Sequence, residues 1–184
     1  MPNDEQGKIL LAIARASIGS AFGRTLLPDT SAPWLAEAGA TFVTLTQNGE
    51  LRGCIGSLEA HRPLLDDVQA NARAAAFRDT RFAPLTEDEF DRTRVEVSLL
   101  SAVQPLTFRD EQDALAQLRP GVDGVLLEYG HHRGTFLPQV WEQLPRKEDF
   151  MAHLKYKAGL PPDFWAEGVK LSRYTVEKWK ENAS

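Results

Sequence analysis

The chain has 184 residues, of which 42% are hydrophobic and 26% are charged, and its formal net charge at pH 7 is -5. This length and composition are those of a globular protein with its own core, built as one domain or two intimate subdomains, and they exclude intrinsic disorder. The acidic balance argues against a protein that binds nucleic acid through its phosphates, because that mode of binding needs an excess of lysine and arginine.

Hydrophobic periodicity and turn residues divide the chain into helices and strands. Apolar residues three and four positions apart predict helices, and strict alternation predicts half-buried strands. Strands linked by hairpins, with irregularly placed helices, favour an α+β fold with mainly antiparallel sheet over a doubly wound parallel sheet. The predicted elements, in chain order, are a helix over residues 4–22, strands over 40–47 and 50–57, a helix from about Pro63 through 76, a short helix capped by Thr86 and Glu89, a strand over 95–99, a helix over 110–118, a strand over 124–129, a polar turn over 130–134, helices over 140–144 and 148–158, and a last strand over 169–177.

The dipeptide Asn48-Gly49 is the strongest local signal. Between two extended runs it is typical of a two-residue hairpin turn. Such a turn would place Leu45 opposite Arg52, and by the same count Val43 would face Cys54. Because Arg52 and Cys54 are two residues apart on one strand, we expect their side chains to point the same way.

The strand after this turn carries the residues best suited to chemistry. Alternate residues on a strand are about 6.6 Å apart, so the guanidinium of Arg52 can reach the thiol of Cys54, where a cation favours the nucleophilic thiolate. Gly53 and Gly56 would let a ligand approach the backbone N–H groups, and Ser57 adds a hydroxyl. The alternative is that Cys54 is an inert core residue and that the glycines mark a bulge or a close packing contact.

Further polar residues could complete a site. Glu96 and Ser98 project from one face of the strand predicted over residues 95–99, so they could lie in a cleft beside Arg52. Glu96 would then be a partner for an arginine more than a catalytic base, and Arg81 could add a second cation. A solvated sheet face explains Glu96 and Ser98 equally well.

The middle of the chain alternates arginines with acidic residues. This pattern predicts a solvated surface whose charges pair with one another, although a local basic patch is compatible with it. The arginines are Arg73, Arg78, Arg81, Arg92 and Arg94, and the acidic residues are Asp79, Glu87, Asp88 and Asp91.

No other pattern indicates a metal or cofactor. Cys54 is the only cysteine, so no disulfide and no site of several thiolates can form within the chain. His131 and His132 are adjacent and would point apart on a strand, whereas metal ligation needs convergence, so we expect a polar hairpin tip there. The common motifs of dinucleotide-binding, phosphate-binding, zinc-protease and serine-hydrolase sites are absent. An acidic, polar amino terminus and the lack of a membrane-length apolar run predict a cytoplasmic protein.

One run of residues closely resembles the signature of a known family. The run Leu51-Arg52-Gly53-Cys54-Ile55-Gly56-Ser57 is similar to the signature hexapeptide of the AMMECR domain family and the residue after it, with Ser57 where the family usually has threonine. The likeness covers nearly the whole chain. The other runs that resemble the family, in its order, are 75–85, 96–100, 121–125, 136–141 and 157–160.

This resemblance implies a single AMMECR-type domain over residues 1–184, made of a larger subdomain and a discontinuous smaller one. It also implies that the signature strand lines a groove between them, which favours a ligand site at Arg52 and Cys54, since clefts between subdomains tend to bind ligands. Short bacterial members of the family are similar to protein A of the AmmeMemoRadiSam system, which is encoded beside a radical S-adenosylmethionine (radical SAM) protein and a Memo-type, dioxygenase-like protein. The resemblance therefore implies partners and not a reaction.

Three functions remain open from the sequence. The first is a cytoplasmic enzyme or enzyme component acting on a small anionic or aromatic metabolite, with Cys54 as nucleophile or acid/base and Arg52, oriented by Glu96, holding an anionic group or stabilising the thiolate. The second is a non-catalytic binding or adaptor protein for the two partners. The third is a nucleic-acid-linked regulator, which the acidic net charge makes the weakest.

Overall fold

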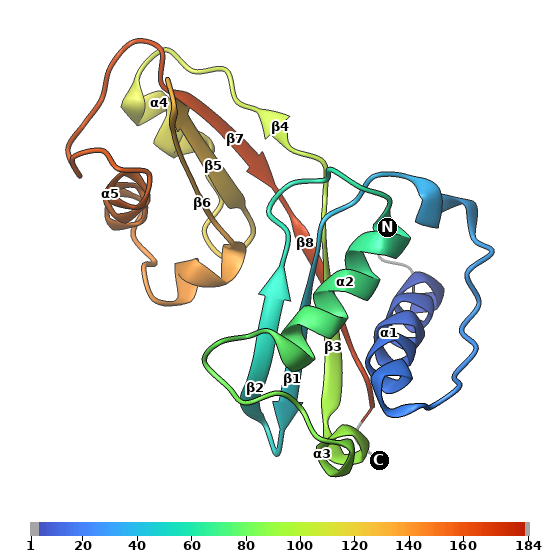
Figure 1. Cartoon of the computed structure of the whole chain (residues 1–184). Helices are drawn as coiled ribbons and strands as arrows, with labels where there is room; N and C mark the ends of the chain where they lie inside the picture. The colour runs from blue at the N-terminus through green and yellow to red at the C-terminus, as the bar shows by residue number, and fades with distance from the viewer. Residues whose placement is uncertain (1–3, 183–184) are drawn as a thin grey trace. The chain divides into compact units, whose positions relative to one another are not determined.

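The computed structural model describes residues 4–182. Within this range the chain forms helices and two four-stranded sheets with antiparallel pairing, which confirms the α+β fold expected from the sequence (Figure 1). Two compact units are present, Met1–Leu100 with Glu177–Ser184 as the first and Ser101–Val176 as the second. The larger unit is the discontinuous one. No helix in the described range is long and apolar enough to cross a membrane.

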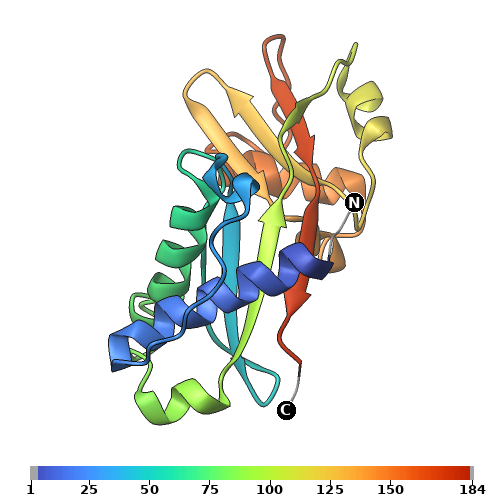
Figure 2. The ribbon, with the colours of Figure 1, turned by 90° about the vertical axis from the view of Figure 1, so that its right-hand side faces the viewer.

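The first unit is a sheet in the strand order β2-β1-β3-β8, with α1 and α2 packed on one face. Helix α2 contacts β1 and β2, and α1 contacts β3. In Figure 2, α1 (blue) crosses in front of the strands of this sheet. The elements of this unit are α1 (Asp4–Gly19), the 3-10 helices η1 (Ser20–Phe22) and η2 (Pro33–Ala36), β1 (Thr41–Gln47), β2 (Glu50–Gly56), α2 (Leu64–Phe77), α3 (Glu87–Arg92), β3 (Arg94–Leu100) and β8 (Val176–Lys180).

Alternation along the strands decides which face of this sheet is buried. Val43 and Leu45 of β1 lie opposite Val97 and Val95 of β3, and all four side chains are buried. They pack against apolar residues of both helices, while the residues between them point to the other face. The helix residues in this core include Leu10, Ile13, Ala14, Val68, Ala72 and Ala75.

The second unit is a sheet in the order β4-β7-β5-β6 with its own core. Phe150 of helix α5 is fully buried, and its ring stacks on Trp141 with centroids 3.7 Å apart. The elements are β4 (Gln104–Pro105), α4 (Glu111–Gln117), β5 (Gly124–Tyr129), β6 (His132–Phe136), the 3-10 helix η3 (Pro138–Glu142), α5 (Lys147–Lys157) and β7 (Lys170–Tyr174).

Two expectations about strands are wrong. The polar run over 130–134 is not all turn, because His132 lies opposite Tyr129 and begins β6. The single last strand expected over 169–177 is two strands, β7 in the second sheet and β8 in the first. The break comes at Thr175, whose N–H donates to the Ser101 hydroxyl and whose carbonyl accepts from the Ser101 N–H. The alternation of residues in the sequence runs on through this point, so it does not reveal that the chain passes from one sheet to the other.

Candidate functional site

The hairpin that leads into the signature strand has the turn that its sequence predicts. Asn48 and Gly49 have φ angles of 53° and 80°, the positive values that a two-residue type I′ turn requires. Gln47 faces Glu50 across the turn.

A β-bulge then shifts the pairing. Leu45 lies opposite Gly53, which leaves Arg52 as an extra residue on β2. The register predicted from the turn length is therefore wrong beyond this point, since Thr44 and not Val43 faces Cys54. At this bulge the side chains of Arg52 and Cys54 have different partners, which are Glu89 for Arg52 and Thr44 for Cys54.

The thiol of Cys54 is half-buried, and its Sγ lies 3.2 Å from Thr44 Oγ1. Strand β2 is the edge strand of its sheet, so the outward N–H and carbonyl of Cys54 find their hydrogen-bond partners in residues that belong to no strand. Its N–H donates to the Asp79 carboxylate at 3.0 Å, and its carbonyl accepts from Arg81 Nη2 at 3.5 Å. At Cys54, residues 79 and 81 take the place that a neighbouring strand would have.

Asp79 joins Arg81 to the backbone of Cys54. Its carboxylate accepts from Arg81 Nε at 3.0 Å and from Nη2 at 2.7 Å. These bonds hold the pKa of Asp79 well below its usual range, so the buried carboxylate is charged at neutral pH. The Arg81 side chain is 56% exposed, so an anchored cation beside Cys54 presents a face to solvent.

Arg52 binds Glu89, and no hydrogen bond joins its guanidinium to Cys54 among the described residues. Its Nε and Nη2 donate to the Glu89 carboxylate at 2.8 Å and 3.1 Å, and Nη2 also donates to the Ala83 carbonyl at 2.8 Å. Glu89 simultaneously closes the capping box of α3 with Thr86, as the sequence predicts.

Replacing Glu89 by glutamine is expected to destabilise the fold in a pH-dependent way. The Arg52 guanidinium lowers the pKa of Glu89 from 4.5 to about 2. Because the pKa in the folded state is the lower one, the charged carboxylate stabilises the fold fully above about pH 4.5, and this contribution is lost as the pH falls toward 2. We expect Glu89→Gln to lower the free energy of unfolding by roughly 2 kcal/mol at pH 7, and the gap to wild type to narrow below pH 4.5 in urea titrations.

Glu87 on the same helix provides the matched control. Its side chain is 54% exposed, and its carboxylate lies 3.4 Å from Arg24 Nε. An exposed ion pair of this kind contributes about 0.5 kcal/mol or less to stability. If Glu87→Gln and Glu89→Gln lower the free energy of unfolding equally, the Arg52–Glu89 pair has no specific role. The same conclusion follows if the difference between Glu89→Gln and wild type does not change with pH.

Glu96 does not orient Arg52, so that expectation is wrong. The Glu96 carboxylate lies 3.6 Å from Lys180 Nζ. On β3, Glu96 is paired with Thr44 of β1. Glu96, Thr44 and Cys54 therefore form a row across one face of the sheet. Ser98 of β3 is buried and lies opposite Phe42.

The small residues of the signature make close packing contacts. A Cβ atom on Gly53 would lie 2.2 Å from the carbonyl oxygen of Ala75 in α2, and one on Gly56 would lie 2.2 Å from the Phe42 ring. The space beside both glycines is filled by the protein itself. These contacts fit the alternative that the glycines serve packing, and they leave a ligand no room at those Cα atoms.

Ser57 belongs to a buried polar network. Its hydroxyl donates to Asp67 Oδ1 at 2.6 Å and lies 3.1 Å from Asn71 Nδ2. Asp67 is fully buried and also accepts from Thr41. This network holds the end of β2 against α2.

Two cavities stand out, and neither is lined by Cys54, Arg52 or Arg81. The cavity in the first unit has a volume of about 570 Å³ and lies where the hairpin turn, the start of β3 and residues 180–182 meet. Among the described residues, no group of three or more histidine, cysteine or acidic side chains is placed to hold a metal ion.

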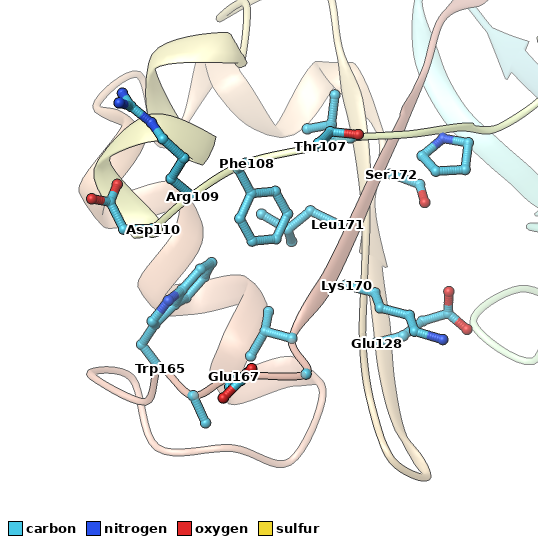
Figure 3. A pocket seen from close by; sticks show the side chains of 15 residues that line it. Thr107, Phe108, Arg109, Asp110, Glu128, Trp165, Glu167, Lys170, Leu171 and Ser172 are labelled. Atoms are coloured by element: carbon cyan, nitrogen blue, oxygen red, sulfur yellow. The ribbon is translucent and has the colours of Figure 1, made fainter.

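The cavity in the second unit has a volume of about 780 Å³ and a mainly apolar floor (Figure 3). Phe108 and Leu171 point toward each other there, and the rings of Phe108 and Trp165 have centroids 5.6 Å apart. The charged ends of Arg109 and Asp110 point away from this floor.

The family model named AMMECR1 matches residues 11–179. The chain belongs to the AMMECR1 family. Protein MJ0810 of Methanocaldococcus jannaschii is 37% identical in an alignment 186 residues long, which covers 96% of this chain and 90% of the relative. Protein SSO0193 of Saccharolobus solfataricus is 38% identical in an alignment 188 residues long, which covers 97% of this chain and 83% of the relative.

A solved structure has the same fold. The crystal structure of the protein PH0010 from Pyrococcus horikoshii superposes with a TM-score of 0.80 at 34% identity, covering 97% of this chain and 93% of the other. The match confirms the resemblance that the signature run suggests. None of these names states a reaction, so a function for this AMMECR1 family member has to be argued from its own residues.

Proposed function

We propose that this AMMECR1 family member is an enzyme, or a component of one, with Cys54 as its reactive group and Arg81 as the residue that binds an anionic part of a small metabolite. The supporting observation is that Asp79 bonds both the Cys54 N–H and the Arg81 guanidinium, which fixes a solvent-accessible cation beside the backbone of the only cysteine. A neighbouring cation favours the thiolate, which is the nucleophilic form of cysteine.

Arg52 takes a positioning role in this proposal. Its guanidinium is neutralised by Glu89, and Nη1, the nitrogen without a hydrogen-bond partner among the described residues, is buried. By bonding the Ala83 carbonyl, Arg52 holds the segment that carries Asp79 and Arg81 against β2. It therefore supports the site without being accessible to a ligand.

The partners and location that we propose rest on the resemblance to short bacterial family members. They are a radical SAM protein and a Memo-type protein of the AmmeMemoRadiSam system, in the cytoplasm. Given such partners and a cationic site, the substrate would be a small anionic or aromatic metabolite.

Alkylation of Cys54 tests this proposal directly, because every signal comes from one residue. On this proposal, iodoacetamide modifies the folded protein at pH 7 faster than the urea-unfolded chain, because only the fold holds the Arg81 guanidinium beside the Cys54 backbone. Arg81→Gln should remove most of that difference. Arg73→Gln, a change at an exposed arginine of α2, should leave it intact. A thiol that reacts only after unfolding would make Cys54 a structural residue and overturn the proposal.

A non-catalytic adaptor is the second proposal, and the cavities favour it, because neither of the two is lined by Cys54. The test is co-purification with the radical SAM and Memo-type proteins of the AmmeMemoRadiSam system. A complex that forms at micromolar concentrations and survives Cys54→Ala would favour the adaptor. Failure to form any complex would count against it.

A further inference from the structure

The cavity in the first unit is lined mainly by polar and charged residues, and we call it the arginine cavity. Its volume of about 570 Å³ is within the usual range for small-molecule sites, about 300–1,000 Å³. The residues that matter for its chemistry are Thr46, Asn48, Arg92, Arg94, Lys180 and Asn182.

Each carboxylate in the wall of the arginine cavity already has a cation. Asp91 lies 2.9 Å from Arg24, and Glu181 binds Arg15 at 2.5 Å. The third, Glu96, lies 3.6 Å from Lys180 Nζ. The acidic lining residues are therefore neutralised, and they do not repel an anion as free carboxylates would.

Two arginines of the same wall have no carboxylate as an ion-pair partner among the described residues. Within residues 4–182, neither Arg92 nor Arg94 forms an ion pair, and the one recorded bond of Arg94 runs from Nε to the Glu181 carbonyl oxygen. Both side chains are exposed. The expectation that the arginines of this section pair with nearby acids is thus wrong for these two, and the cavity has surplus positive charge in a chain of net charge -5.

The wall that carries these arginines is fixed by further bonds. Arg15 donates to the carbonyl oxygens of Phe90 and Thr93 as well as to Glu181, whose carboxylate also accepts from the Val95 N–H. Helix α3, the start of β3 and the chain after β8 are thereby tied together. A wall held this way loses little conformational entropy when a ligand binds.

We propose that the arginine cavity binds a small polyanion, one molecule with two or more phosphate or carboxylate groups. Each guanidinium of Arg92 and Arg94 can donate two parallel hydrogen bonds to an oxyanion, and two such forks match a ligand with two anionic groups. Thr46 and the amides of Asn48 and Asn182 add neutral donors. This site shares no residue with the Cys54 site and does not depend on the function proposed there.

Calorimetric titration of the whole chain tests the proposal, with inorganic pyrophosphate and citrate as probes at constant ionic strength. We expect saturable binding of one probe molecule per chain, weakened about tenfold or more by Arg92→Gln combined with Arg94→Gln. Arg92→Gln alone, which removes no recorded intramolecular bond, should weaken binding in the same direction if the double variant fails to fold. Arg73→Gln is the control and should leave the affinity unchanged.

The two probes separate the sources of the anion. Binding of pyrophosphate without citrate would assign a phosphate ester, and the reverse would assign a polycarboxylate, with either result supporting the site. No saturable binding of either probe up to about 10 mM, or an equal affinity in wild type and both variants, would overturn the proposal.

Discussion

Gly53→Ala is expected to lower the free energy of unfolding by about 3 kcal/mol or more, or to prevent folding. The added Cβ would lie 2.2 Å from the Ala75 carbonyl oxygen and 3.1 Å from its carbon. These are backbone atoms of α2, so relief requires the helix to move away from β2. Guanidinium chloride unfolding of the purified variant measures the loss.

Gly23→Ala separates this contact from the general cost of replacing glycine. Gly23 has a φ of 74°, and a Cβ there would meet nothing within 4 Å, so only backbone strain of about 1 kcal/mol is expected. Gly53 has no positive φ. If Gly53→Ala costs no more than Gly23→Ala, the close approach of α2 to the signature strand is not what requires glycine there.

Local signals in the sequence predict the parts of the site that depend on neighbouring residues. The Asn48-Gly49 turn and the Thr86-Glu89 capping box both form as expected, because all the atoms involved lie within four residues of one another. The pairing of an arginine with Asp79 is likewise a contact between residues two apart.

Contacts between distant residues could not be predicted in the same way. The bulge at Arg52 depends on how β2 packs; the adjacent Gly53 is compatible with a bulge, but a glycine fits a close packing contact equally well and does not fix the register. Glu89 becomes the partner of Arg52 across 37 positions of sequence, while the expected partner Glu96 pairs with Lys180. The sequence places Asp79 among surface charges, yet its carboxylate is buried at the edge of β2. The burial comes from the fold, since β2 is an edge strand whose outer N–H group needs an acceptor.

These distant contacts change the chemistry assigned to the signature. The sequence favours Arg52 as the cation for Cys54, but the fold neutralises Arg52 with Glu89 and places Arg81 beside the Cys54 backbone. The alkylation rate of Cys54 in Arg52→Gln therefore reports the loss of a positioning residue, and the rate in Arg81→Gln reports the loss of the accessible charge.

Asp67→Asn is expected to cost about 3–4 kcal/mol of stability. The carboxylate is fully buried and accepts five hydrogen bonds, two from Thr41, one from Asn71, one from Ser57 and one from Arg62. An amide in its place would turn an N–H group toward donors and leave Arg62 without its counter-charge. Urea unfolding at pH 7 measures the loss.

Asp66→Asn is the matched control. Asp66 is exposed and precedes Asp67 in the first turn of α2, so both variants lose a similar interaction with the helix dipole, about 0.5 kcal/mol. The difference between the two variants therefore isolates the buried network at Ser57. If Asp67→Asn lowers stability while the alkylation rate of Cys54 in the folded protein is unchanged, the signature divides into a structural end at Ser57 and a reactive centre at Cys54. Equal stability losses for the two variants would show that the buried carboxylate does not hold the end of β2.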